Sequence, residues 1–139
     1  MPVDLTGDIS EAIGNALAER TVVLVGTASA DGEPDIAYKG SAMVWDAEHM
    51  AFWERAGGQT LQNLTDNPKV CLLYSNPQRG GWRFFGVAEL HRQGDMRDQI
   101  MARTVQAELD RDPERKGVGV LIRIDRVIQG RSVIMSRDS

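Results

Sequence analysis

A glycine pair followed by a glutamine and a threonine, Gly57-Gly58-Gln59-Thr60, is the stretch of this chain best suited to binding an anion. The residues from Thr60 to about Asp66 predict a short helix with Leu61 and Leu64 on one face. Free N–H groups and the positive end of the helix dipole favour a phosphate or carboxylate at such a helix start. The pattern therefore indicates an anion site, although an ordinary turn in which Thr60 only caps the helix has the same sequence.

Two cationic side chains on neighbouring predicted strands could face the same anion. Lys39 stands in the segment "AYKGS", and Arg55 follows "FWE" on the next strand. A phosphate monoester carries about −1.5 to −2 charges at neutral pH, so one or two cations are what it needs. The alternative is that both side chains are solvated strand ends, as surface lysine and arginine usually are.

The other reactive residue types form no catalytic pattern. Cys71 lies among apolar neighbours and is expected to be a buried structural thiol. His49 and His91 belong to no Ser–His–Asp or Cys–His order, so the sequence assigns no catalytic residue. With two histidines and one cysteine, no dedicated metal site is expected. Trp53 lies beside the glycine-rich turn and could border a flat ring, although a core position is the alternative.

The elements that must position these residues are mostly strands. Helices are predicted over 8–20 (capped by Asp8), 60–66 and 95–109, and strands over 21–29, 35–45, 50–55, 69–75, 82–92 and 117–135, the last as one strand or a pair. The polar stretch that follows the last helix, "AELDRDPERKG", is expected to be a solvated helix end. Short turns favour antiparallel pairing, and the absence of a long helical crossover in the first half argues against a Rossmann fold. The prediction is a single mainly β (α+β) domain over 1–139, a six-stranded antiparallel β-barrel, closed or split, with flanking helices.

Composition and charge exclude several classes of protein. The formal net charge of −4 argues against a general nucleic-acid binder. No apolar run approaches the roughly 18 residues that span a bilayer, so no membrane interaction is expected. The N-terminus has neither a basic start nor an apolar core, and a single cysteine cannot form an internal disulfide. A cytoplasmic protein is therefore expected.

Three segments, taken in order, resemble the pyridoxamine 5'-phosphate oxidase-like family of FMN-binding split β-barrels. They are "VGTASADGEPDIAYKGS", "HMAFWERAGGQTLQNLTDNPKV" and "GWRFFGVAEL", and the resemblance runs from Val22 to about His91. It implies a split barrel that forms a homodimer with two FMN sites at the subunit interface. The family's flavin-lining and phosphate positions, carried onto this chain, are Tyr38, Lys39, Gly40, Ser41, Trp53, Glu54, Arg55, Gly58, Gln59 and Thr60.

Two departures from the family pattern bear on function. Many relatives have arginine or lysine in the pair that is Gln59-Thr60 here, so Lys39 or Arg55 would have to compensate for a missing phosphate cation. The true vitamin B6 oxidases carry an Arg-x-His motif near the C-terminus, whereas this chain ends "GRSVIMSRDS" and has no histidine after His91. Oxidation of pyridoxamine phosphate is therefore not expected.

The resemblance predicts an FMN-dependent oxidoreductase acting on a small-molecule substrate, with the flavin performing the chemistry. Three alternatives stay open: a reductase that uses deazaflavin F420 on the same fold, a flavin-binding or electron-carrier protein without turnover, and a flavin-free dimeric barrel.

Overall fold

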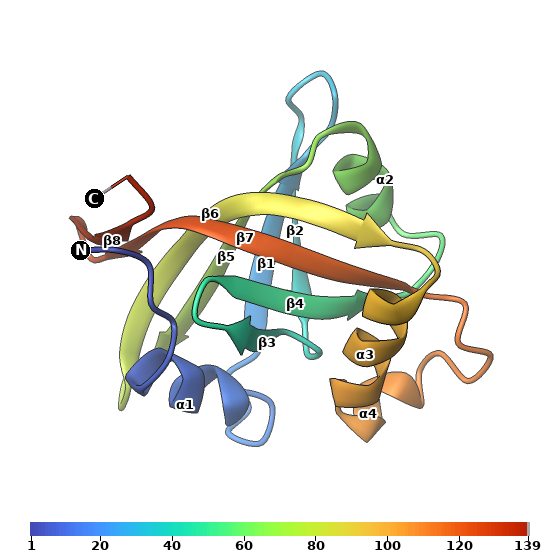
Figure 1. The fold of residues 1–139 in the computed structure, drawn as a ribbon, viewed down its shortest axis with the longest axis horizontal. Coiled ribbons are helices and arrows are strands. Elements are labelled where there is room, and N and C mark those ends of the chain that lie inside the picture. Colours follow the sequence, from blue (N-terminus) through green and yellow to red (C-terminus); the bar gives the residue numbers. More distant parts are fainter. Residues whose placement is uncertain (139) are drawn as a thin grey trace.

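Alternating apolar and polar residues build one antiparallel sheet in the computed structural model, which describes residues 1–138 (Figure 1). Its strands are β1 (Val23–Ala28), β2 (Pro34–Lys39), β3 (Met43–Asp46), β4 (His49–Glu54), β5 (Lys69–Asn76), β6 (Gly80–His91), β7 (Val118–Gln129) and β8 (Ser132–Ser136). The helices are α1 (Asp8–Gly14), α2 (Gln59–Asp66), α3 (Asp95–Arg103) and α4 (Gln106–Leu109).

The order of strands across the sheet is β2-β1-β5-β6-β7-β4-β3, and β8 also pairs with β7. The two outermost strands, β2 and β3, follow one another in the chain and are joined by residues 40–42. No ladder links these two strands within the described part of the chain, so the barrel stays open between them. The predicted antiparallel split β-barrel with flanking helices is confirmed.

The number of strands is eight rather than the predicted six, because two expected strands are interrupted. The stretch over 35–45 divides at Gly40 into β2 and β3, and the C-terminal stretch divides at Gly130 into β7 and β8. Gly130 has a φ of 61°, in the left-handed region that glycine adopts freely, and the chain turns back there.

Two helices also differ from the prediction. The residue at the N-cap of α1 is Gly7 rather than Asp8, and α1 ends at Gly14 instead of continuing to residue 20. The helix expected over 95–109 is two helices, because Thr104 adopts an extended backbone with ψ of 137°. The Thr104 hydroxyl donates back to the Ile100 carbonyl at 2.7 Å, which satisfies a carbonyl at the end of α3.

Two apolar clusters hold these elements together. The larger fills the barrel interior, where the inward side chains of the strands meet α1. It includes Val25, Phe52, Leu72, Phe84 and Ile122. The smaller lies on the other face of β4, where Ala51 and Trp53 pack against Ile100 of α3 and Leu109 of α4.

The helices lie around the barrel as the two clusters require. In Figure 1, α3 and α4 lie together beside the end of β4, and α1 lies below β3. The helix α2 contacts β1 and β2 at another end of the barrel. None of the helices within residues 1–138 is both long and apolar enough to cross a membrane.

Candidate functional site

Three adjoining hollows meet at the turn 39–41 that leads from β2 to β3. The first, the apolar hollow, has a volume of about 290 Å³ and is lined mainly by Ile13, Leu17, Val22, Ala42, Met43 and Val44. The second, the middle hollow, has a volume of about 170 Å³ and is lined by Lys39, Gly40, Trp53, Arg55, Glu108 and Arg111 among others. The third, the cationic hollow, has a volume of about 410 Å³ and reaches Gly57 and Gly58.

Shared residues join the three hollows into one groove. Lys39 and Gly40 line both the apolar and the middle hollow. Lys39, Arg55 and Arg111 line both the middle and the cationic hollow. One end of the groove is therefore lined mainly by aliphatic side chains, together with Lys39 and Arg103, and the other end is positively charged.

Lys39 and Glu54 end two different strands and form an ion pair inside the groove. The Lys39 Nζ lies 2.5 Å from the Glu54 Oε1, and the two side chains are only 15% and 5% exposed. The ammonium also lies 5.6 Å from the centre of the Phe52 ring. Glu54 therefore already neutralises the lysine that the sequence suggested for a phosphate.

Arg55 is a free cation at the same place. Its side chain is exposed and lines both the middle and the cationic hollow. It forms no ion pair or hydrogen bond with any other residue in the range 1–138. Of the two cations expected from the sequence, Arg55 is the one available to a ligand.

The start of α2 has unpaired donors beside the cationic hollow, which Gly57 and Gly58 line. Gly58 is the N-cap residue, and no side chain caps the helix. The first main-chain bond of this helix runs from the Gln62 N–H to the Gly58 carbonyl at 3.3 Å, so the N–H groups of Gln59, Thr60 and Leu61 have no helical acceptor. The predicted helix start is therefore where the sequence placed it and faces the groove through Gly57 and Gly58.

The side chain of Gln59 is directed elsewhere. Its Nε2 donates to the Asn63 Oδ1 at 2.8 Å, and the Asn63 Nδ2 donates to the Thr27 hydroxyl at 3.0 Å. This chain of bonds ties α2 to β1. Gln59 lines a separate hollow with Arg92, and Thr60 is buried. Roles for these two side chains at a phosphate stay predictions.

Ser41 and Tyr38 occupy very different positions, although the sequence placed both along the flavin. The buried Ser41 hydroxyl accepts from the Trp53 N–H and donates to the Trp53 carbonyl, both at 3.0 Å. Tyr38 lines the middle hollow, but its side chain is 76% exposed. Successive side chains of a strand point to opposite faces, so Tyr38 and Lys39 project to opposite sides of β2.

Gly40 makes room for a carboxylate from α4. A Cβ atom at Gly40 would stand 2.8 Å from both Cδ and Oε2 of Glu108, which is closer than such contacts allow. Glu108 therefore lies directly against the turn from β2 to β3. It supplies hydrogen-bond acceptors to the middle hollow, whose lining otherwise consists of cations, aromatic rings, Gly40 and two aliphatic side chains.

Asp112 is a further residue that the sequence did not reveal. Its carboxylate accepts hydrogen bonds from the Trp53 Nε1 at 2.9 Å and from the N–H groups of Lys116 and Gly117 at 3.0 and 2.9 Å. Burial by itself would raise the pKa of Asp112, but these hydrogen bonds outweigh it and the pKa lies below its ordinary value.

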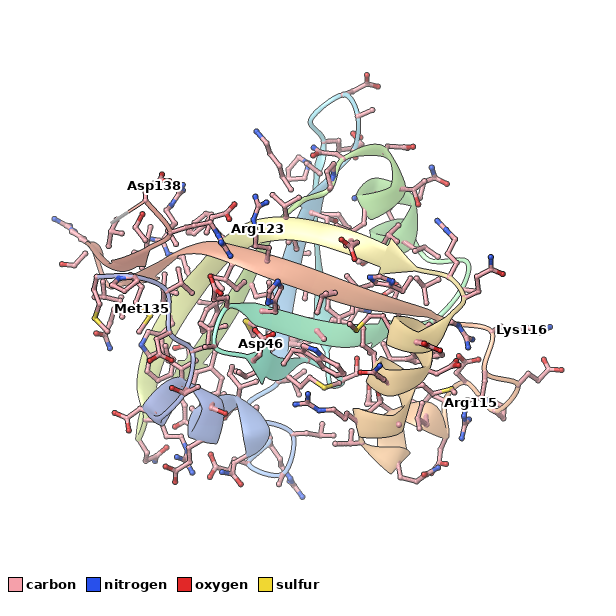
Figure 2. The ribbon with its side chains drawn as sticks, in the orientation of Figure 1. Asp46, Arg115, Lys116, Arg123, Met135 and Asp138 are labelled. Atoms are coloured by element: carbon pink, nitrogen blue, oxygen red, sulfur yellow. The ribbon has the colours of Figure 1, made fainter. Side chains whose placement is uncertain are left out.

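The segment around Asp112 was expected to be a solvated helix end, and most of its charged side chains are exposed, but Asp112 itself is buried. After α4 the segment is a loop to β7 that carries Arg115 and Lys116 (Figure 2) and returns Asp112 to the interior. An aspartate before a proline is a signal for a structured turn. Nothing in the sequence links it to Trp53, which lies 59 residues earlier.

The histidines and the cysteine contribute no further site. His49 pairs with Asp46 at 2.8 Å, and His91 pairs with Glu89 at 2.5 Å. Among residues 1–138, no three His, Cys, Asp or Glu side chains gather as a metal ion would require. Cys71 is half-buried rather than buried, and desolvation raises the pKa of its thiol.

The chain is similar in sequence and in fold to several known proteins. The chain is 32% identical over 111 residues to the uncharacterized protein MJ0282 of Methanocaldococcus jannaschii, a match that covers 78% of this chain and 72% of the relative. Its fold matches that of HupZ from Group A Streptococcus with a TM-score of 0.69 at 26% identity, over 89% of this chain and 98% of the other.

Two more distant structures share the fold. An FMN-binding protein of Syntrophomonas wolfei matches with a TM-score of 0.68 at 15% identity, over 88% of this chain and 86% of its own. An F420 reductase matches with a TM-score of 0.60 at 18% identity, over 82% of this chain and 94% of its own. The family model for pyridoxamine 5'-phosphate oxidase matches residues 9–129. The chain therefore belongs to the pyridoxamine 5'-phosphate oxidase family.

Proposed function

We propose that this chain binds FMN in the groove beside the turn 39–41 and acts as an FMN-dependent oxidoreductase on a small-molecule substrate. One observation carries the proposal: a single groove joins a hollow lined mainly by aliphatic side chains to a cationic hollow that contains a free arginine and reaches the uncapped start of α2 at Gly57 and Gly58. FMN has a matching shape, with a flat ring system that has one apolar, dimethylbenzene edge at one end of the molecule and a phosphate at the other. Membership of the family supports the same cofactor.

The charge at the cationic end suits one phosphate. Arg55 contributes one positive charge, and the start of α2 contributes the equivalent of about +0.5. A phosphate monoester carries about −1.5 to −2 charges at neutral pH. Lys39 adds little to this sum because Glu54 neutralises it. The residues present therefore fit the phosphate of FMN, with Arg55 as its principal side-chain partner.

The residues around the groove would bind and orient the cofactor. A bound flavin supplies the hydride or electron chemistry itself. Trp53 is held at three points, since its indole donates to Asp112 and its main chain bonds Ser41 twice. The Ser41 hydroxyl proton is engaged by the Trp53 carbonyl, and the Tyr38 side chain projects to the other side of β2 from Lys39, so no proton donor is proposed from these two hydroxyl groups.

We propose that the active form is a homodimer, because the outer face of β2, β1 and β5 carries exposed and half-buried apolar side chains. Ile36 and Tyr38 of β2 are 65% and 76% exposed. Leu24 of β1 stands opposite Tyr38, and Leu73 of β5 stands opposite Leu24, so an apolar row crosses three strands. Monomeric proteins rarely expose large contiguous apolar patches. A second copy of the chain is the proposed cover.

F420 is the second candidate cofactor, and the Lys39–Glu54 pair is the observation that favours it. A buried carboxylate beside the anion position suits a phosphodiester, which carries one negative charge, better than a phosphate monoester. The fold shared with an F420 reductase is consistent with this alternative. A flavin-binding protein without turnover would use the same groove and differ only in its reactivity.

The test is a calorimetric titration of cofactor-stripped protein with FMN, riboflavin and F420. We expect FMN to bind at least about tenfold more tightly than riboflavin, because riboflavin lacks the phosphate. Arg55→Ala should remove most of this difference. The matched control is Arg131→Ala, which changes an exposed arginine in the turn between β7 and β8.

Three outcomes would contradict parts of the proposal. Equal affinity for FMN and riboflavin would show that the groove has no phosphate site. Binding of F420 alone would show that F420, and not FMN, is the cofactor. Binding of none would leave a flavin-free barrel. If FMN binds, loss of the visible flavin absorbance on addition of NADPH under anaerobic conditions would distinguish an enzyme from a flavin carrier.

A further inference from the structure

The cationic hollow holds more positive charge than a single phosphate needs. Arg55 and the start of α2 already match one phosphate monoester. The loop between α4 and β7 nevertheless brings two additional cations to the same hollow. Its charged lining consists of Lys39, Arg55, Arg111 and Lys116 on one side and Glu54 and Asp112 on the other.

The two carboxylates in this lining already have partners. Glu54 forms the ion pair with Lys39. Asp112 accepts three N–H groups, one from the Trp53 indole and two from the backbone of its own loop. Neither carboxylate is paired with Arg111 or Lys116.

The partners of the two additional cations are loosely held. The Arg111 Nη1 lies 3.9 Å from the Glu108 Oε2, and the Lys116 Nζ lies 3.3 Å from the Glu114 Oε2. The side chains of Arg111 and Lys116 are 61% and 68% exposed. Ion pairs in such solvated positions contribute little. Both cations can therefore turn toward a ligand at small cost.

The loop that carries these cations is rigidly built. The Arg115 Nη1 donates to the carbonyls of Leu109 and Asp112, both at 2.7 Å. The Arg97 guanidinium donates to the carbonyls of Gly117 at 3.1 Å and Arg115 at 2.6 Å. These bonds fix the backbone on both sides of Lys116. A preorganised loop loses less conformational entropy when its side chains bind a ligand.

We propose that Arg111 and Lys116 form a second anion subsite, next to the phosphate position at Arg55 and the start of α2. A ligand that carries another anionic group beyond this phosphate would then gain a contact that FMN lacks. This inference rests on the proposed function, since it extends the same groove. The pyrophosphate of FAD and the glutamate carboxylates of F420 are two sources of the required chemistry.

The experiment compares FMN, FAD and F420 by calorimetric titration of the wild-type protein and the double variant Arg111→Gln/Lys116→Gln. We expect the double variant to lose about tenfold or more in affinity for FAD or F420, and less than about threefold for FMN. The matched control is Lys69→Gln/Arg131→Gln, which removes two exposed charges from residues that line none of the three hollows and should leave all three affinities unchanged.

The possible results distinguish the two sources of the second anion, and they distinguish failure of the second subsite from failure of the proposed function. A loss confined to F420 identifies carboxylates as the second anion, and a loss confined to FAD identifies a pyrophosphate. An equal loss for FMN, or no loss for any ligand, overturns the second subsite while the FMN site stands. A wild-type protein that binds none of the three overturns the proposed function, and the subsite falls with it.

A second measurement covers the case in which the double variant does not fold. Because salt screens exposed charges, each additional ion contact steepens the dependence of affinity on ionic strength. In the wild-type protein, affinity for the ligand that uses the second subsite should fall more steeply with added NaCl than affinity for FMN. Equal slopes for all three ligands would overturn the subsite.

Discussion

The hydroxyl of Ser41 bonds the main chain of Trp53 in both directions, accepting from its N–H and donating to its carbonyl, each at 3.0 Å. Ser41 lies in the connection between β2 and β3, where no ladder continues. One side chain therefore replaces the backbone partner that Trp53 would otherwise need. Because Trp53 lines the middle hollow, these two hydrogen bonds also fix that part of its lining.

Ser41→Ala should destabilise the fold by about 1–3 kcal/mol, because it leaves a buried N–H and a buried carbonyl of Trp53 without partners. The measurement is urea unfolding followed by tryptophan fluorescence. Ser75→Ala, at an exposed position of β5, is the control and should change the free energy of unfolding by less than about 0.5 kcal/mol. A similarly small effect of Ser41→Ala would show that water replaces the hydroxyl.

Lys39 and Glu54 should behave as a coupled pair. Lys39→Met leaves a buried carboxylate unpaired, and Glu54→Gln leaves the ammonium without its counter-charge, so each should cost about 2–4 kcal/mol. The double variant should cost less than the sum, with a coupling energy of about 1–3 kcal/mol. Urea unfolding of the four proteins measures this energy. Strict additivity would show that the two side chains are independent in solution.

Glu54→Gln should also strengthen FMN binding, because it releases the charge of Lys39 to the phosphate. An increase of about tenfold is expected for one additional charge contact in a partly buried site. Glu33→Gln, in the exposed hairpin between β1 and β2, supplies the control with the same change in net charge. If Glu54→Gln and Glu33→Gln act alike in calorimetry, the phosphate does not lie near Lys39.

Asp112 should make stability depend on pH in the acidic range. Its pKa is lower in the folded chain than the ordinary value of 3.8, so its contribution is complete above pH 3.8 and is lost as the pH falls through the folded pKa. Asp112→Asn should therefore be less stable than wild type at pH 7, and the difference should shrink toward pH 2.5. Urea midpoints at several pH values test this sign. A difference that stays constant over the range would mean that the carboxylate is not ionised in the fold.

Tyr74→Phe should leave stability unchanged or raise it. The Tyr74 hydroxyl is buried and has no hydrogen-bond partner among residues 1–138, while its ring stacks on Trp82 at 5.7 Å. Removing an unsatisfied buried hydroxyl relieves a desolvation cost of about 1–3 kcal/mol. Tyr38→Phe, at an exposed ring, is the matched control. A clear loss of stability in Tyr74→Phe alone would reveal a hydrogen bond to bound water.

Local sequence was enough to predict most of the fold. In β6, the buried residues Trp82, Phe84, Gly86 and Ala88 fall at every second position, as the alternation of a strand predicts. The contact between Glu108 and Gly40 could not be predicted, because it depends on how α4 packs.

The candidate site was predictable only where its residues belong to the first half of the chain. Arg55 and the start of α2 lie at one cationic hollow as expected from their order. The neutralisation of Lys39 was missed because Glu54 belongs to another strand, and side chains of different strands meet only through the barrel. Arg111, Asp112 and Lys116 were missed because a mixed-charge segment has the same composition whether it is solvated or folded back.

The missing ladder between the edge strands β2 and β3 determines where this barrel can begin to unfold. Opening there breaks no main-chain ladder, since the two strands are not paired with one another in the described structure. Amide hydrogens along β2 and β3 should therefore exchange with solvent before those of β6 and β7, which lie inside the sheet. A ligand that contacts both β2 and β3 would hold these two edge strands together. Slower exchange at these edge amides would report its binding without any assay of turnover.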